Sequence, residues 1–235
     1  MYYMSVMETL YNNKYYSRKR RYEHFESIEG LVYNRAHRYK IISTNGFAID
    51  PDRLSSDYRI TRFVRDPRDL IISGYFYHLR GAEPWFRMKN PTANYWSAIN
   101  GNVPAGMPKN TSYSEYLQSL SQEDGLLAEI EFRKHQLASL REWQGNPKIK
   151  LFKYEDIIGN EVQTFKQIFD FMELSSTEKT IGSFLAKRYS SEKKLANKKH
   201  IRNASPGQWQ EYFSDNITNI FNNQYGDILE KYEYQ

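Results

Sequence analysis

Apolar residues in this chain follow two spacings, one typical of short strands and the other of amphipathic helices. Runs rich in β-branched and aromatic residues indicate strands, and such runs lie at 39–44, 60–64 and 149–152. Apolar residues that recur every three or four positions indicate helices, and this spacing occurs at 1–13, 70–78, 125–143, 162–172, 177–188 and 209–221. Because strands alternate with helices, we expect an α/β fold with a mainly parallel sheet flanked by helices.

One long stretch, residues 81–110, shows neither spacing. It holds four of the eight prolines, and its aromatic residues include Trp85, Phe86, Tyr95 and Trp96. Long irregular segments in compact domains are usually functional or disordered, and this aromatic content argues against disorder. We therefore expect an ordered excursion that serves as a lid or as a wall for a ligand.

The turn after the second expected strand places charged residues at the start of a helix. Asp66 can cap this helix, Pro67 suits its first position, and Asp69 favours its positive end. Arg65 thus emerges at the carboxyl end of a strand, beside a helix N-terminus, where open α/β sheets bind anions. A structural alternative has equal weight: Arg65 and Arg68 pair with the two aspartates on a solvated turn.

Composition narrows the class of protein. A chain of 235 residues suits one domain with a substantial core. The net charge of +5 favours an anionic ligand, whereas the interleaving of acidic and basic residues does not favour a nucleic-acid surface. The absence of cysteine excludes disulfides and thiolate chemistry. No apolar run approaches the roughly 20 residues of a membrane helix, and no signal peptide is visible, so we expect a soluble, cytoplasmic protein.

The strand-turn-helix stretch also carries a family motif. Residues 64–75, VRDPRDLIISGY, resemble the 3′-phosphate-binding motif of the sulfotransferases that use 3′-phosphoadenosine 5′-phosphosulfate (PAPS), Val-Arg-(Asn/Asp)-Pro-(Arg/Lys)-Asp-(Leu/Val)-x-x-Ser-x-Tyr. In that family the arginine and the serine of the motif bind the 3′-phosphate. The resemblance therefore implies this role for Arg65 and Ser73, within a parallel sheet like that of P-loop kinases and sulfotransferases.

A second segment supports the same family. Residues 151–157, LFKYEDI, are similar to a sulfotransferase strand that ends in Tyr-Glu-Asp-Leu, whose tyrosine contacts the adenine. The resemblance implies that Tyr154 binds the base. Without the resemblance, a Tyr-Glu-Asp sequence after a strand is explained equally well as a turn with a capping aspartate.

A third segment lies in a basic stretch near the C-terminus. Residues 202–209, RNASPGQW, resemble the family's Arg-Lys-Gly-x-x-Gly-x-Trp, in which the arginine and backbone amides close over the 3′-phosphate. Arg202, Gly207 and Trp209 match this pattern, whereas Asn203 and Ala204 replace the lysine and the first glycine. The resemblance implies cofactor binding by Arg202 and Gly207, since a guanidinium can grip phosphate through two N–H groups.

One family element has no counterpart in this sequence. Sulfotransferases carry a loop near Lys-x-Gly-(Ser/Thr)-(Ser/Thr) after their first strand, which holds the 5′-phosphosulfate, and no segment here matches it. Residues 1–13 look like the helix that normally follows the loop. We expect residues 1–235 to form a single sulfotransferase-like domain whose first strand and loop have been truncated. The alternative is a natural variant without the loop.

The catalytic base is left unassigned. Cytosolic family members use a histidine at the end of the strand before the phosphate motif, and Asn45, which cannot accept a proton, occupies that place. Other branches use a glutamate nearer the N-terminus, which points loosely to Glu23, Glu26 or Glu29. The candidates left open are Glu23, Glu26, Glu29, His24 and His37, although a structural role is the default for both histidines.

The resemblance implies transfer of a sulfuryl group from PAPS, as co-substrate and without a metal, to a hydroxyl or amine. The acceptor would be a small molecule, a sugar or a lipid, and nucleic acid is not expected as a partner. A non-catalytic relative that binds a nucleotide or another anion is one alternative. A kinase of related fold is another, although its Gly-x-x-x-x-Gly-Lys-(Ser/Thr) motif is absent from the sequence. The sequence does not indicate an oligomeric state.

Overall fold

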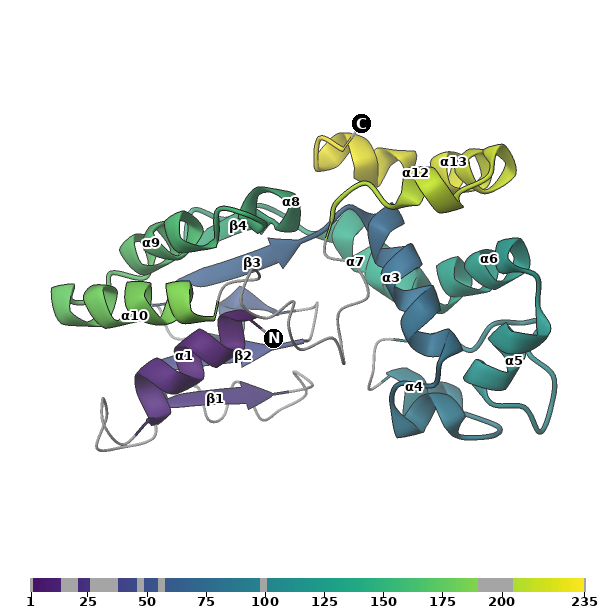
Figure 1. The fold of residues 1–235 in the computed structure, drawn as a ribbon, viewed down its shortest axis with the longest axis horizontal. Coiled ribbons are helices and arrows are strands. Elements are labelled where there is room, and N and C mark those ends of the chain that lie inside the picture. The colour runs from purple at the N-terminus through teal and green to yellow at the C-terminus, as the bar shows by residue number, and fades with distance from the viewer. Residues whose placement is uncertain are drawn as a thin grey trace. The chain divides into compact units, whose positions relative to one another are not determined.

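The computed structural model describes residues 2–13, 21–25, 38–45, 49–54, 58–97, 101–189 and 205–234. Contacts divide the chain into two compact units, each built from two separate stretches of sequence (Figure 1). Unit 1 comprises Met1–Val64 and Gly145–Ala204, and unit 2 comprises Arg65–Gln144 and Ser205–Gln235. The expectation of a single domain stays a prediction.

Unit 1 holds the strands of the described chain. β1 (Tyr22–Phe25) pairs in parallel with β2 (Ile41–Thr44), and β3 (Ile60–Val64) pairs in parallel with β4 (Ile149–Lys153). The described residues therefore form two two-stranded parallel sheets. The three expected strands are confirmed, with β2 beginning two residues later than expected. β1 was not expected, because its sequence, Tyr-Glu-His-Phe, does not alternate apolar and polar residues.

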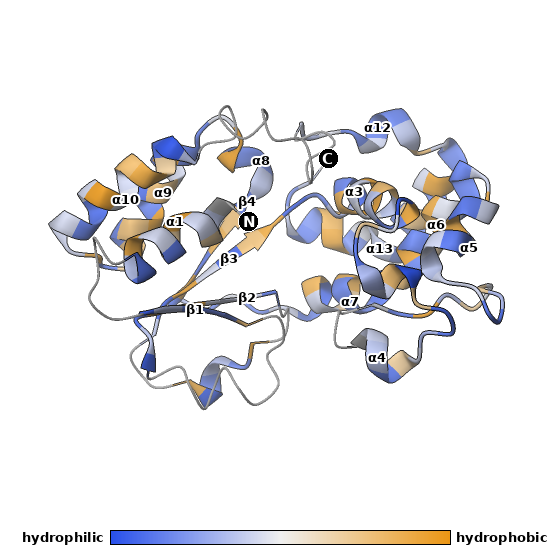
Figure 2. Ribbon diagram, turned by 60° about the horizontal axis from the view of Figure 1, so that its bottom comes forward, coloured by the Kyte–Doolittle hydropathy of each residue, from blue (hydrophilic) through white to orange (hydrophobic). Residues whose placement is uncertain are grey.

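Helices pack with these strands around an apolar core in unit 1. The helical elements of unit 1 are α1 (Tyr2–Asn12), a 3-10 turn η2 (Pro51–Arg53), α8 (Tyr154–Ile157), α9 (Glu161–Phe171) and α10 (Ser176–Arg188). Each of the helices α1, α9 and α10 carries both apolar and polar residues (Figure 2). Their apolar faces, with residues of β1, β2 and β4, form the core: Val6, Met7, Leu10, Tyr11, Tyr22, Ile41, Phe152, Phe165, Ile168, Phe169, Leu174, Leu185 and Ala186.

Unit 2 is helical in its described part, and α3 contacts several of its other helices. Its elements are α3 (Pro67–Leu79), a 3-10 turn η3 (Pro84–Arg87), α4 (Ala93–Ser97), α5 (Tyr113–Ser119), α6 (Gln122–Phe132), α7 (Lys134–Glu142), α12 (Trp209–Tyr212) and α13 (Asp215–Lys231). α3 packs against α5, α6 and α12. The helix that follows Arg65 thus packs against three other helices of this unit. None of the helices in the described residues is long and apolar enough to cross a membrane.

The expectation of one helix over 125–143 is wrong. The structure has α6 and α7, separated at Arg133, whose backbone angles (φ −90°, ψ 7°) lie outside the helical region. α6 also begins earlier than expected, because the Ser121 side chain accepts a hydrogen bond from the Asp124 amide and caps it. The spacing of apolar residues did not reveal the break, since Ile130 and Leu137 are buried seven residues apart on either side of it.

The aromatic excursion contributes to the core of unit 2. η3 and α4 lie within it, so the stretch is ordered where it is described. Phe86 and Trp96 are both buried. The Phe86 ring lies 4.0 Å from the His78 ring, and the Trp96 ring lies 5.3 Å from the Phe132 ring. These two residues therefore serve packing, whereas the side chain of Tyr95 is 43% exposed.

Candidate binding site at the start of α3

Arg65 lies between β3 and α3, as the local sequence signals predicted. β3 ends at Val64, the Asp66 side chain accepts a hydrogen bond from the Arg68 amide at 2.9 Å, and Pro67 is the first residue of the helix. The N-cap and the proline together begin the helix directly after the turn. The Arg65 side chain is 16% exposed, and its Nη2 lies 3.6 Å from Oδ2 of Asp69.

Arg68 is held inside the protein. Its Nε and Nη2 donate to the two carboxylate oxygens of Asp66 at 3.0 and 2.7 Å. The centre of its guanidinium lies 3.7 Å from the centre of the Trp209 ring, within the range of a cation–π contact. The structural alternative, in which Arg65 and Arg68 pair with the two aspartates, is therefore confirmed for the ion pairs, but not for the exposure of the turn to solvent. Asp66, Arg68 and Asp69 are all buried, so the turn is not a solvated one.

Asp69 connects the start of α3 to the Gly-x-Trp segment. Its side chain is fully buried, and its two oxygens accept hydrogen bonds from the backbone N–H groups of Gly207 at 2.7 Å and Trp209 at 2.9 Å. The sequence indicated for Asp69 an interaction with the helix dipole or an ion pair with a neighbouring arginine, but no contact with this segment. The signal missed is that a carboxylate in a helix's first turn also needs donors when it is buried.

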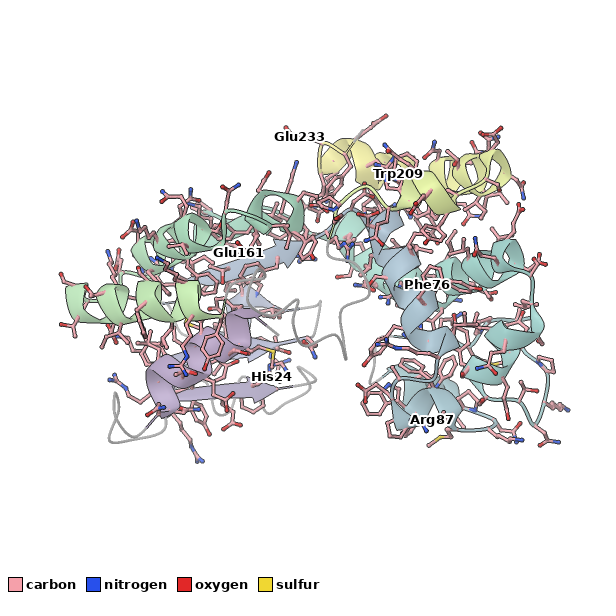
Figure 3. All side chains as sticks on the ribbon, in the orientation of Figure 1. His24, Phe76, Arg87, Glu161, Trp209 and Glu233 are labelled. Carbon is pink, nitrogen blue, oxygen red and sulfur yellow. The ribbon has the colours of Figure 1, made fainter. Side chains whose placement is uncertain are left out.

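Ser73 lies on the same side of α3 as Asp69, because residues four apart face one another on a helix. Its side chain is exposed. The next turn of the helix carries Phe76, whose ring packs against Tyr212 of α12 at 5.2 Å; Phe76 and Trp209 are labelled in Figure 3. The face of α3 with Asp69 and Phe76 is thus bordered by the segment that begins at Gly207, while the hydroxyl of Ser73 stays accessible.

Gly207 adopts a backbone conformation that favours glycine. Its φ is +79°, and a side chain there would meet no atom within 4 Å, so the conformation and not crowding explains the residue. Its N–H donates to Asp69 and is used within the protein. The cofactor-binding role of Gly207 stays a prediction. Arg202 lies outside the described residues.

Tyr154 begins α8 directly after β4, and it is half-buried. In the register of β3 and β4, Val64 lies opposite Lys153. These are the residues that precede Arg65 and Tyr154 in the chain. The role of Tyr154 at the adenine stays a prediction.

Comparison with known proteins decides the family. A family model described as "Sulfotransferase domain" matches residues 8–233. The chain belongs to this sulfotransferase family. No curated protein sequence matches the chain. Family membership confirms the resemblance carried by the sequence motifs.

A solved sulfotransferase structure agrees with the fold. Mouse sulfotransferase SULT7A1, complexed with PAP, aligns with a TM-score of 0.51 and 15% identity, over 97% of this chain and 79% of that one. Two structures of retinol dehydratase, one with androsterone and PAP and one with retinol and PAP, align with TM-scores of 0.40. Their identities are 17% and 19%, over 80% of this chain and 52% of theirs. The expected α/β architecture with parallel strands flanked by helices is confirmed.

Two of the candidate bases of this sulfotransferase-family chain lie on β1. Glu23 and His24 are both half-buried. Nδ1 of His24 is 2.8 Å from Oγ of Ser43 on β2, and the same Oγ is 2.6 Å from the Tyr22 hydroxyl. His24 thus has a polar partner in the sheet, which suits the structural default. Glu26, Glu29 and His37 lie outside the described residues, so the base stays unassigned.

A buried polar cluster supports α3 one turn beyond Ser73. The Glu129 carboxylate lies 2.7 Å from Nδ1 of His78 and accepts hydrogen bonds from the Tyr113 hydroxyl at 2.9 Å and from Nε of Arg133 at 2.6 Å. Burial lowers the pKa of His78, although Glu129 opposes the shift. Burial would raise the pKa of Glu129, but the charges and hydrogen bonds of His78 and Arg133 hold it below its usual value.

Because of this cluster, we expect the free energy of unfolding to fall on acidification. Unfolded His78 binds a proton near its ordinary pKa of 6.5, whereas the folded state resists protonation, so stability falls as the pH drops below that value. Glu129, whose pKa is also lowered, adds a second loss below its ordinary value of 4.5. Urea unfolding at pH 7.5 and pH 5.5 should show a lower midpoint at pH 5.5. His78→Gln should flatten this dependence, and an unchanged dependence would contradict the assignment.

Proposed function

We propose that the protein transfers a sulfuryl group from PAPS to a hydroxyl or amine of an acceptor. The observation that carries the proposal is the meeting of two motifs in unit 2. Asp69 in the 64–75 motif binds the backbone of Gly207 and Trp209, which lie 138 and 140 positions further along the chain. Both segments were assigned to the same 3′-phosphate from separate resemblances, so their hydrogen bonding supports a common anion site.

In this proposal Arg65 and Ser73 bind the 3′-phosphate. A guanidinium at a helix N-terminus is suited to phosphate, since its planar N–H groups and the helix dipole both favour an anion. Ser73 adds an exposed hydroxyl on the side of α3 that Asp69 occupies. Arg202 and the turn at Gly207 would complete the grip, and Tyr154 would contact the adenine.

The reaction would be an in-line displacement. The acceptor oxygen or nitrogen forms a bond to sulfur while the bond from sulfur to the 5′-phosphate oxygen breaks, and the acceptor proton passes to a base. Adenosine 3′,5′-bisphosphate (PAP) is the product that leaves. The protein's part is to position the two reactants and to stabilise the charge that develops on the bridging oxygen. Of the candidate bases, Glu23 and His24 are the two that lie on a described strand.

The acceptor is proposed only as a class, a small molecule, sugar or lipid with a free hydroxyl or amine. Phe86 and Trp96 are used in the core of unit 2, so an acceptor wall in the aromatic excursion would rest on residues such as Tyr95.

A non-catalytic protein that binds PAP is the second candidate. The observation that favours it is the absence of a Lys-x-Gly-(Ser/Thr)-(Ser/Thr) segment from the 235 residues. Without such a loop, the 5′-phosphosulfate would lack its backbone donors, and transfer would be slow even if the 3′-phosphate were bound.

Turnover separates the two candidates. The chain is incubated with PAPS labelled with sulfur-35 and a panel of phenols, aliphatic alcohols, sugars and amines, and PAP release is measured together with labelled product. The proposal predicts equal amounts of PAP and sulfated product for at least one acceptor class. Binding of PAP without transfer to any acceptor would favour the non-catalytic alternative.

A further inference from the structure

Three charged residues that follow Arg65 each make a structural contact within the protein. Asp66 caps α3 and holds Arg68, and Arg68 lies against the ring of Trp209. Asp69 holds the backbone of Gly207 and Trp209. The turn at 207–209 is thus attached to α3 at two points, through its backbone and through its indole ring. Neither attachment uses the side chain of Arg65, which is 16% exposed.

The Asp69 carboxylate is an unusual group to bury beside an anion site. Its side chain is fully buried, and its negative charge lies 3.6 Å from Nη2 of Arg65, where it opposes the approach of a phosphate. Burying a carboxylate is costly unless donors satisfy it. Its donors here are two backbone N–H groups from the distant turn, so its charge is already used to fix that turn.

We propose that Asp69 is a positioning residue for recognition of the 3′-phosphate: it fixes the Gly207–Trp209 turn and orients the Arg65 guanidinium without touching the ligand. This inference rests on the proposed function. One Asp69 oxygen, Oδ2, both accepts the Gly207 N–H and faces Arg65, so a single atom links the turn to the phosphate-binding side chain. Displacing the carboxylate would loosen both at once.

The sign of the effect distinguishes positioning from simple electrostatics. If Asp69 acted only through its charge, its neutralisation would strengthen binding of the dianionic 3′-phosphate, because a repulsive charge is removed. If Asp69 served only folding, its replacement would lower the fraction of competent protein but leave the affinity of that fraction unchanged. Positioning predicts a loss of affinity that is confined to ligands with a 3′-phosphate.

Asp69→Asn tests this directly in the full chain. The amide keeps one acceptor oxygen, but its NH2 group cannot accept the second backbone N–H, so one of the two hydrogen bonds from Gly207 and Trp209 is lost. Calorimetric titration should show PAP affinity reduced about tenfold or more. The affinity for adenosine 5′-monophosphate, which lacks the 3′-phosphate, should stay the same, and the stoichiometry should remain one ligand per chain.

Asp227→Asn is the matched control. It makes the same chemical change in the same unit, where Asp227 forms an exposed ion pair with Arg141, and PAP affinity should not change. Gly207→Ala is a second variant that disturbs the turn from the other side. A side chain there meets no atom within 4 Å but must adopt a φ of +79°, so the protein should fold while its PAP affinity falls severalfold.

The outcomes separate failure of the inference from failure of the proposed function. If the wild-type chain binds PAP no better than adenosine 5′-monophosphate, the 3′-phosphate site itself is refuted. If the wild-type chain prefers PAP and Asp69→Asn binds it equally well or more tightly, Asp69 is not a positioning residue. A lower stoichiometry with unchanged affinity would assign Asp69 to folding alone, and it would also overturn the inference.

Discussion

Arg65→Ala should weaken PAP binding by about 1.5–3 kcal/mol, roughly 10- to 150-fold, because charged hydrogen bonds to the 3′-phosphate are lost. The substitution leaves Asp69 with its two backbone donors, Gly207 and Trp209, so the turn should stay in place. Calorimetric titration with PAP measures the effect. The affinity for adenosine 5′-monophosphate should change little, since that ligand has no 3′-phosphate.

Arg80→Ala provides the control for this result. Arg80 is the exposed C-cap residue of the same helix, and its guanidinium lies 5.2 Å from the Tyr77 ring. The variant loses one positive charge, as Arg65→Ala does, but at the opposite helix end. Equal losses of PAP affinity in both variants would indicate a general effect of net charge. Unchanged affinity in Arg65→Ala would remove Arg65 from the site.

Gly74→Ala should destabilise the protein by about 1–3 kcal/mol. A Cβ at this position would overlap Oε1 of Glu129 and Nη2 of Arg133, so these ion-paired side chains must shift. Adding a methyl group to a packed interior typically costs about 1–3 kcal/mol, and more where a buried charge loses its partner. This exceeds the roughly 1 kcal/mol that alanine contributes in a helix relative to glycine. Urea unfolding at pH 7.5 measures the difference.

Gly226→Ala is the matched control for helix propensity. Gly226 lies within α13, and a Cβ there would meet no atom within 4 Å. This variant should be stabilised by up to about 1 kcal/mol. If Gly74→Ala were as stable as Gly226→Ala, the close approach of α3 to the Glu129–Arg133 pair would not exist in solution.

The start of α3 could be predicted because its signals are local. A capping aspartate, a proline at the first helical position and a preceding β-branched strand lie within a few residues of one another, and each acts on its own backbone. The same local rules correctly placed the strand at 149–152. They did not decide between an anion-binding turn and a solvated turn, and both alternatives stayed open.

The contacts of Asp69 could not be predicted, because its partners are 138 and 140 positions away. Nothing in the residues around it distinguishes a carboxylate that favours the helix dipole from one that binds a distant turn. The break at Arg133 was missed for another reason. The buried residues on its two sides keep a helical spacing, so the apolar pattern carries no mark of a single non-helical residue.

The aromatic excursion shows a third limit. Its composition indicated that it would be ordered, and the structure places Phe86 and Trp96 in a core. Composition alone cannot assign an aromatic residue to a core or to a ligand wall, because both surroundings exclude water from the same rings.

The central claim is a 3′-phosphate site at the start of α3. It is tested most directly by calorimetric titration of the wild-type chain with PAP and with adenosine 5′-monophosphate under identical conditions. The proposed site predicts one PAP bound per chain, at least about tenfold more tightly than the monophosphate, since the two ligands differ by one phosphate with charged hydrogen bonds. Equal affinity for the two ligands, or binding of neither, would contradict it.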